Sequence, residues 1–567
     1  MKKILPALFF LSALPLAAQV SPTWGNDVLD INSVRAGVNS NGDLFWNYIN
    51  PQFQVPADSM TTTIIAGALW IGGLDTMNQL HLAAQTYRQT GNDFFNGPVM
   101  NSANYSTAND IAWAHVWKIN KSTIDTFLMH FVNPALFPGY TIPASIMNWP
   151  GNGDVNQGQA PQLAPFVDMN SDGYYDPNAG DYPCIKGDQS IFFIFNDDRS
   201  NHTETGGAKF GIELHGMLYG YKAPGTWLDS VVFVNYRLFN RTANDYNNLD
   251  LGSWADFDIG FAGDDYIGCD VARNIYYGYN GDADDGSGPA PTTYTYGANP
   301  PAQGVVFLRG PEPSLNDGID NDHDGQTDEA NELCAFNRFI YYNNDFSATG
   351  NPATSWDYYK YMSGRWKDSS LVTYGGNGYG GTTPAAFMFP GNTDPAGIGT
   401  NYTPQPAWDE YTAGNSPGDR RGLGVSGPFP LPAHKEMCID FAYVFGRGLN
   451  GPLSSVAVMQ NNSDSAVAFY NTTTPCLCVP NPLAVHEYHS ITPQVYPNPS
   501  DGNVTVFWQP QTPGAKLELY DMTGNVVLAM TINHAQTEIS MEDLATGIYL
   551  LRITDGNKSG TAKIIKE

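Results

Sequence analysis

The stretch DSVVFVNYRLFN, residues 229–240, has the alternation that is typical of a β-strand. Apolar side chains occupy alternate positions from Val232 to Leu238 and form one face, whereas Asn235 and Arg237 point to the other side. The pattern predicts a strand that is buried on its apolar face and turns Asn235 and Arg237 outward. It sets the expectation for the rest of the chain, which repeats such runs.

The composition supports a mainly β protein. Aromatic residues make up 13% of the 567 residues and charged residues only 15%, while glycine (58) and proline (40) are frequent. We expect a large β-rich central module of several sheets with long loops, followed by a small C-terminal β-sandwich. Segments with a strand pattern, in addition to 229–240, are 62–73, 190–197, 209–221 and 437–446; those that favour a helix are 355–366 and 453–470.

The negative charge of the chain makes some classes of binding partner less expected than others. The formal net charge is −29, so the basic surface that nucleic-acid binding requires is not expected. Divalent cations are the natural counter-charge for such a chain.

The N-terminus predicts export. Residues 1–18 combine Lys2 and Lys3, an apolar run and small residues up to Ala18, which is the pattern of a secretory signal peptide. No later apolar run is long enough to span a bilayer, so we expect no transmembrane segment in the mature chain. The six cysteines of an exported chain favour disulfides, with 15 complete pairings open.

Changes in composition along the chain predict two modules. Residues 19–478 form the central module, with a candidate subdomain break near 165–185, and residues 479–494 have the composition of a linker. Residues 495–567 contain short strands at the spacing of a small β-sandwich. The strand-like runs are 503–508, 516–521, 525–530, 547–553 and 561–566.

Motifs in the terminal module carry a resemblance. VYPNPSDGNVTV, LELYDMTGNVV, LATGIYLLRI and the final KIIKE occur in order. Together they resemble the type A C-terminal sorting domain of the type IX secretion system. The matching positions are Tyr496, Pro497, Asn498, Pro499, Asp521, Gly524, Gly547, Tyr549, Lys563 and Lys566.

The resemblance implies a path for the chain. It implies passage through the periplasm and across the outer membrane by the type IX machinery, followed by removal of the domain by a sortase-like peptidase. The cargo would then be released or attached to the cell surface. The alternative from the residues alone is an accessory β-domain. Phrases in 27–447, such as ALWIGGLD and GDRRGLGVSGPFPL, also resemble long cargo proteins of this system, which implies one integrated module and no particular reaction.

An acidic loop, DGIDNDHDGQTDE (317–329), predicts a structural calcium site. Oxygen ligands at alternate positions with a glycine at the turn are the arrangement of calcium loops. Asn331 stands where an EF-hand has its closing glutamate, and Glu332 is an alternative to Glu329 in that role. The loop resembles those of thrombospondin type 3 repeats; the alternative is a solvated acidic turn. The predicted ligands are Asp320, Asp322, Asp324, Gln326 (through its carbonyl), Asp328 and Glu329.

A second loop, 167–183, repeats these offsets, with an Asx-rich turn as the alternative. Its predicted calcium ligands are Asp168, Asn170, Asp172, Tyr174 (through its carbonyl), Asp176 and Asp181. A third acidic segment, 254–270, places Asp256 and Asp258 on one face of a strand, where either a metal ion or a catalytic pair would fit. Strand-end aspartates without such a role are the alternative. The other aspartates of this segment are Asp264, Asp265 and Asp270.

No catalytic motif stands out. The chain has no HExxH, GxSxG or GxxxxGK[ST] sequence, and the order of Ser426, His434 and Asp440 is no evidence for a triad. We therefore expect a calcium-stabilised binding, adhesive or structural surface module, with a surface glycan as one candidate ligand. The alternative is a secreted, glycan-directed hydrolase that uses carboxylates of the central module. Trp70, Trp117, Trp149 and Trp366 could stack on sugars or belong to the core.

Overall fold

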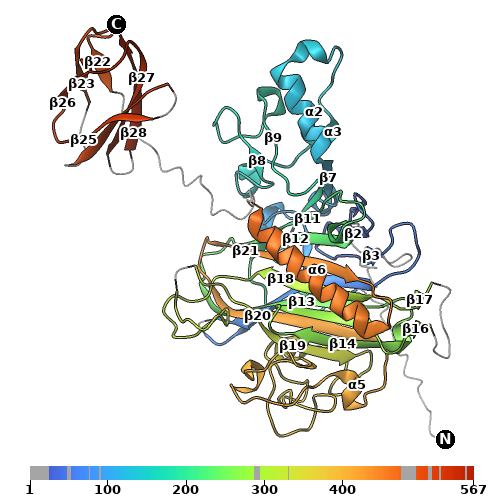
Figure 1. The fold of residues 1–567 in the computed structure, drawn as a ribbon. Coiled ribbons are helices and arrows are strands. Elements are labelled where there is room, and N and C mark those ends of the chain that lie inside the picture. Colours follow the sequence, from blue (N-terminus) through green and yellow to red (C-terminus); the bar gives the residue numbers. More distant parts are fainter. Residues whose placement is uncertain are drawn as a thin grey trace, which may run out of the picture. The chain divides into compact units, whose positions relative to one another are not determined.

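A computed structural model describes residues 24–47, 53–75, 77–87, 91–286, 294–329, 331–473, 493–508, 514–522, 525–555 and 558–567. The chain forms two compact units, 1–477 and 478–567, and both are built mainly of β-strands (Figure 1). The predicted signal peptide, most of the predicted linker and Gly524 lie outside the described residues.

The strand predicted at 229–240 is β12 (Val231–Asn240), and it lies inside the larger sheet of the first unit. It pairs antiparallel with β11 (Ile212–Gly220) on one side and β21 (Glu436–Gly446) on the other. In the described part of the chain this sheet has nine strands, ordered β14-β15-β18-β21-β12-β11-β10-β6, with β7 also paired to β10. The remaining strands are β14 (Asp265–Asp270), β15 (Ile275–Asn280), β18 (Ala302–Arg309), β10 (Gln189–Asn196), β6 (Phe95–Asn96) and β7 (Trp117–Asn120).

The strand β12 is buried on both faces. The predicted apolar face, which includes Val234, joins the main core, and Phe233 on the opposite face lies in a second cluster. The expectation that Asn235 turns outward is therefore wrong: it is 2% exposed. Its side-chain amide donates a hydrogen bond to Asp440 on β21 (3.0 Å), which satisfies the polar group inside the protein. Arg237 remains partly exposed.

A second sheet packs against the first through the same core. Its strand order is β19-β20-β13-β4-β5, and Trp70 and Trp254 stack in it with ring centroids 6.2 Å apart. The core contains side chains from both sheets, so the first unit is built around two sheet layers. The strands are β4 (Ile64–Leu74), β5 (Leu80–Ala83), β13 (Tyr246–Phe257), β19 (Phe336–Asn343) and β20 (Arg420–Leu431).

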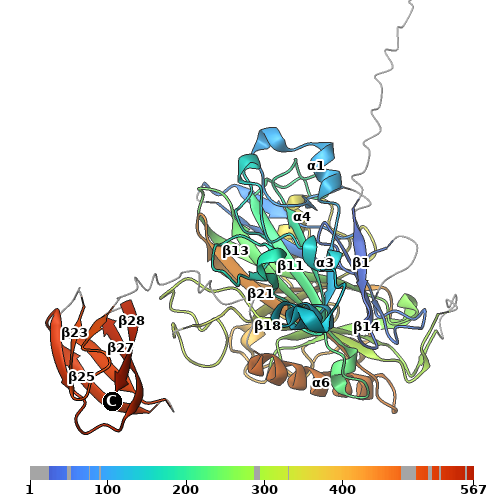
Figure 2. The same cartoon turned by 90° about the horizontal axis from the view of Figure 1, so that it is seen from above.

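The long helix α6 (Pro452–Thr472) lies along the outer face of the larger sheet (Figures 1 and 2). Val456, Met459 and Ala466 lie on its buried side and pack against side chains of that sheet, such as Phe233. The helices predicted at 453–470 and 355–366 are thus present as α6 and as α4 (Ser355–Met362).

Five short helices and several small elements complete the described part of the first unit. The helix α2 (Lys121–Val132) was not predicted, although Ile124, Phe127, Leu128 and Phe131 of KSTIDTFLMHFV lie at helical spacing; of these, Ile124 and Phe127 are buried. The other helices are α1 (Thr107–Ala112), α3 (Ala144–Met147), α4 (Ser355–Met362) and α5 (Glu410–Ala413). The 3-10 turns are η1 (Ser102–Asn104), η2 (Pro134–Leu136), η3 (Val155–Gln157), η4 (Pro177–Ala179), η5 (Trp227–Ser230), η6 (Ala262–Asp264) and η7 (Ile398–Thr400). The small sheets contain β1 (Asn26–Leu29), β2 (Arg35–Asn39) and β3 (Phe53–Gln54); β8 (Phe166–Val167) and β9 (Tyr182–Pro183); and β16 (Asp284–Asp285) and β17 (Gly297–Ala298).

Cysteines of the first unit are found in both redox forms. Cys184 and Cys438 are disulfide-bonded, whereas Cys269 and Cys334 are buried free thiols. Burial raises the pKa of the Cys334 thiol to about 12, so it stays protonated.

The second unit consists of two small antiparallel sheets around their own core, as expected for a β-sandwich. Leu517 and Leu519 point inward from β24, and Leu551 and Ile553 from β27. One sheet contains β22 (Gln494–Tyr496), β23 (Asn503–Phe507) and β26 (Gln536–Ser540); the other contains β25 (Val526–Ile532), β24 (Ala515–Tyr520), β27 (Gly547–Asp555) and β28 (Lys558–Lys566).

Candidate metal centres

The acidic loop 317–332 lies between β18 of the larger sheet and β19 of the smaller one. It is curled by hydrogen bonds from its own backbone. Asp320 accepts from the amides of Asp324 (3.1 Å) and Gly325 (3.0 Å). Gly325 has a φ of 95°, a conformation that glycine adopts without steric cost. The loop base is closed by the Cys334 amide, which donates to the Pro311 carbonyl (2.8 Å).

The curl brings carboxylates together. Ligand oxygens of Asp320, Asp322 and Glu332 lie within 4.8 Å of one another, and so do those of Asp322, Asp324 and Glu329. Glu332 is 8% exposed and accepts from the Asn321 amide, so it is held in place on the inner side of the loop. The sequence had offered Glu332 only as an alternative to Glu329.

The remaining predicted residues of this loop have other contacts. The Asp328 carboxylate accepts from the Gly318 amide (3.1 Å), and the Gln326 side chain donates to Asp324 (3.0 Å). Several effects act on the pKa of Glu329. A backbone hydrogen bond to its carboxylate lowers the pKa, but desolvation and the charges of Glu332, Asp322 and Asp324 together raise it, and the net shift is upward. Glu329 therefore lies in the negative potential of these three neighbouring carboxylates.

The loop 168–181 has the same backbone pattern. Asp168 accepts from the amides of Asp172 (3.3 Å) and Gly173 (2.7 Å), which are the same offsets as in the first loop. Asp181 is fully buried and accepts from the amides of Met169 and Asp176, both at 2.8 Å.

The other predicted residues of this loop also lie near its turn. Asn170 donates to Asp172 (2.8 Å), and the Tyr174 amide donates to Asp172 as well (2.8 Å). Among its described residues, no three carboxylates converge within the spacing found in the first loop.

The third acidic segment assembles with a residue that the sequence did not suggest. Asp256 and Asp258 meet Asp419, and their ligand oxygens lie within 4.8 Å of one another. Asp270 instead pairs with Arg273 (Nη1 to Oδ2, 2.9 Å). Asp419 is more than 160 positions away from Asp258, and only the pairing of β13 with β20 brings it near.

The residues considered for catalysis and for sugar stacking make contacts inside the fold. The Ser426 hydroxyl donates to the Cys334 carbonyl (3.0 Å), and Asp440 accepts from the Tyr470 hydroxyl (2.7 Å). Among the described residues no hydrogen bond links Ser426, His434 and Asp440. Three of the four tryptophans named above are buried in the protein, namely Trp70, Trp149 and Trp366.

A cavity of about 530 Å³ lies beside α2 and the loop that follows β9. It is lined by two carboxylates, Asp125 and Asp188, among other residues. Asp125 pairs with Lys121 (2.7 Å), and Asp188 accepts from the Lys222 amide (2.9 Å). Both lining carboxylates are therefore engaged in local contacts.

In the second unit, several motif residues join the first and last strands. The Asn498 side chain donates to the Lys563 carbonyl (2.6 Å) and accepts from the Ile565 amide (2.9 Å). Lys566 donates to the Asp501 carbonyl, and the Tyr549 hydroxyl donates to the Ala545 carbonyl (2.7 Å). Asn498 and Lys566 thus join the segment after β22 to β28, whereas the Tyr549 bond is local to the start of β27.

The second unit matches a known protein family. The family model of the secretion system C-terminal sorting domain matches residues 494–567. The chain is therefore a cargo protein of the type IX secretion system, exported to the cell surface or secreted, and its terminal unit interacts with that machinery. No helix among the described residues is long and apolar enough to cross a membrane.

Comparison with known proteins adds little for the first unit. No curated protein matches the chain. Among solved structures, the chain is similar to a polysaccharide lyase at 9% identity, over 72% of this chain and 37% of the lyase, with a TM-score of 0.18. The chain thus spans little more than a third of the lyase, and a TM-score this low carries no argument about fold or activity.

Proposed function

We propose that the exported chain is a calcium-stabilised module, displayed on the cell surface or secreted, that serves in binding or as a structural component. The observation that carries the proposal is the convergence of Asp320, Asp322 and Glu332 within 4.8 Å of one another in a curled loop. Calcium binds six to eight oxygen ligands at about 2.3–2.6 Å, so one ion can bridge oxygens at this spacing.

Electrostatics favour an ion in this loop. Two carboxylates about 4 Å apart repel each other by about 4 kcal/mol at an effective dielectric constant of about 20. A bound calcium ion adds an attraction to each carboxylate that offsets this repulsion. The loop joins β18 of one sheet to β19 of the other, so fixing it would brace the connection between the two layers.

We extend the proposal to the loop 168–181, with Asp168, Asp172 and Asp181 among its ligands. It is supported by the hydrogen bonds from positions five and six to the first aspartate, which are the same in both loops. After export, we propose that a sortase-like peptidase removes the sorting domain at residues 495–567 and leaves the calcium-stabilised unit outside the cell.

The test is thermal unfolding of the purified chain, first treated with chelator and then titrated with calcium. A site at 100-fold excess of calcium over its Kd stabilises by about 2.7 kcal/mol, which is about 3 °C for a unit of this size. The double variant Asp320→Asn/Asp322→Asn should lose that increment, and isothermal titration calorimetry should show one fewer bound ion.

The matched control is Asp58→Asn, an exposed aspartate outside both loops. It should retain the calcium-induced shift. If calcium leaves the unfolding midpoint of the wild-type chain unchanged and no heat of binding is measured, the calcium proposal is wrong.

A further inference from the structure

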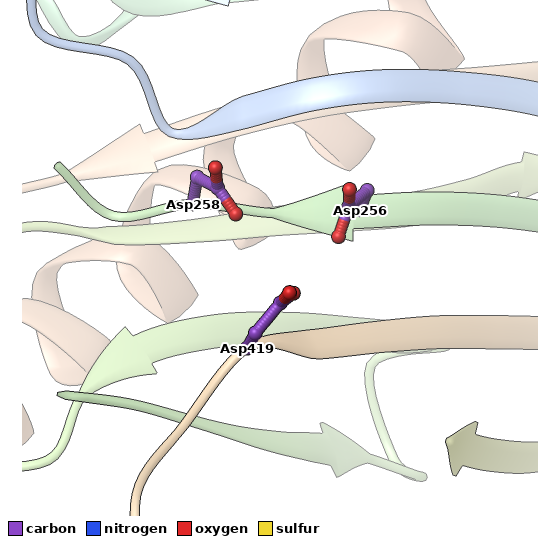
Figure 3. Close-up of side chains that lie close together, drawn as sticks. All are labelled: Asp256, Asp258 and Asp419. Atoms are coloured by element: carbon purple, nitrogen blue, oxygen red, sulfur yellow. The ribbon is translucent and has the colours of Figure 1, made fainter. Parts of the chain in front are cut away.

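Three carboxylates converge at a place in the second sheet that is distinct from both acidic loops. Asp256 lies near the end of β13, Asp258 follows that strand, and Asp419 immediately precedes β20. Figure 3 shows the Asp419 side chain extending from its segment toward Asp256 and Asp258. Their ligand oxygens lie within 4.8 Å of one another.

The cluster carries more negative charge than its described neighbours neutralise. Arg421 donates to Asp419 through Nη1 (2.8 Å), and its Nη2 lies 3.5 Å from Asp256. Its Nε donates to the Tyr87 hydroxyl (2.7 Å), which in turn donates to Asp256. In the described part of the chain, Arg421 is the one cation in contact with these three carboxylates.

One oxygen of the cluster has no described partner. Asp256 is 3% exposed, and its Oδ1 is buried without a hydrogen bond, whereas its Oδ2 accepts from Tyr87. A buried polar atom without a partner costs about 1–3 kcal/mol, and more when it is charged. No donor to the Asp258 carboxylate is found among the described residues either. These oxygens are free to bind a ligand.

Burial and like charge make it costly to ionise these carboxyl groups. Burial raises the pKa of Asp256 to about 7, and burial together with the charges of Asp256 and Asp419 raises the pKa of Asp258 well above its usual range. Asp265 is fully buried, and its Oδ1 also has no described partner. Its Oδ2 accepts from the Ile259 amide (2.9 Å), next to Asp258.

We propose that Asp256, Asp258 and Asp419 form a calcium site in the second sheet, separate from the two acidic loops. The donor set consists of carboxylate oxygens, which hard divalent cations prefer, and its spread matches ligands on opposite sides of a calcium ion. The Asp419 side chain is 33% exposed, so the site is open to solvent on that side, where water ligands complete the coordination.

The ion would cross-link two adjacent strands of the second sheet. It would join the end of β13 to the start of β20, which are adjacent antiparallel strands with Asp256 paired opposite Arg421. Arg421 would remain bound to Asp419 and Tyr87, so the cation adds charge compensation without displacing the existing contacts.

The experiment compares the chelator-treated full-length chain with Asp258→Asn and Asp419→Asn, using calcium chloride as the titrant in isothermal calorimetry. Each variant should bind one calcium ion fewer than the wild type, and its calcium-induced rise in unfolding midpoint should shrink. Without calcium, Asp258→Asn should unfold at the same temperature as the wild type or higher, because the asparagine cannot ionise beside Asp256 and Asp419. Asp419→Asn is partly exposed and guards against a failure to fold.

The loop double variant Asp320→Asn/Asp322→Asn separates this inference from the proposed function. It should retain the ion held by Asp256, Asp258 and Asp419, so combining it with Asp258→Asn should remove two ions. If Asp258→Asn and Asp419→Asn both bind as many ions as the wild type, the site does not exist. A lower unfolding midpoint of Asp258→Asn in chelator, with unchanged calcium binding, would show that Asp258 has a structural role only.

Discussion

The buried Glu204 predicts how the stability of the first unit depends on pH. Its Oε1 accepts from the Thr86 amide (2.9 Å) and hydroxyl (2.7 Å), while its Oε2 is buried without a described partner. Burial raises the pKa of Glu204 to about 8; the Thr86 bonds oppose this rise, and the charges of Asp93 and Asp43 add to it.

The direction in which stability changes with pH follows from the folded and unfolded pKa values of Glu204. The folded pKa of Glu204 lies above the unfolded value of 4.5, so the folded state binds more protons between these two pH values. This contribution is fully present below about pH 4.5 and is lost as the pH rises through about 8. The difference of about 3.5 units, at about 1.4 kcal/mol per unit, corresponds to about 5 kcal/mol at most.

The variant Glu204→Gln copies the protonated side chain and cannot ionise. Its midpoint of thermal unfolding should match that of the wild type near pH 5 and exceed it by up to about 5 °C at pH 9, for a unit with an unfolding entropy of about 0.9 kcal/mol/K. Differential scanning calorimetry across this pH range measures the difference. Glu312→Gln, whose side chain is 66% exposed, is the control and should follow the wild-type profile. Parallel profiles for Glu204→Gln and the wild type would refute the reasoning.

Other perturbations test the packing, a buried ion pair and the division into units. Trp254→Ala should lower the free energy of unfolding by about 3–5 kcal/mol in denaturant titrations, because Trp254 is fully buried against Trp70, whereas Trp254→Phe should cost less. Arg420→Ala should cost about 3–5 kcal/mol because Glu410, which is fully buried, loses its partner at 2.9 Å; an equal cost in the double variant with Glu410→Ala would contradict this. Deleting residues 494–567 should stop delivery to the cell surface, measured by fractionation, but leave the unfolding midpoint of the first unit unchanged; normal delivery would contradict it.

The strand and helix predictions succeeded where one periodicity dominated. The segment 229–240 is a strand because its alternating apolar positions leave one solution for burying them. The segment 453–470 is a helix that buries Val456, Met459 and Ala466 on one side. The outward orientation of Asn235 was wrong, since the sequence of one strand does not show that a helix covers its other face. The helix α2 was missed although Ile124, Phe127, Leu128 and Phe131 lie at helical spacing, so the signal for it was present in the sequence.

The acidic loops show which features the spacing of residues within one loop can predict. Alternate aspartates near a glycine predict a curl within one loop, and the backbone bonds to Asp320 and Asp168 follow from that local geometry. The position of Glu332 beside Asp320 depends on how the loop returns to β19, which the spacing left undecided.

The sequence by itself determined the mainly β class, the acidic loops and the sorting domain, because each depends on residues that are neighbours in the chain. Only the tertiary structure decided that Asp419 meets Asp256 and Asp258, that Asn235 is buried, and that three of the candidate stacking tryptophans are core residues. The physical reason is that strand pairing joins segments more than a hundred residues apart. Burial, charge compensation and ligand convergence are properties of the neighbours that such pairing creates.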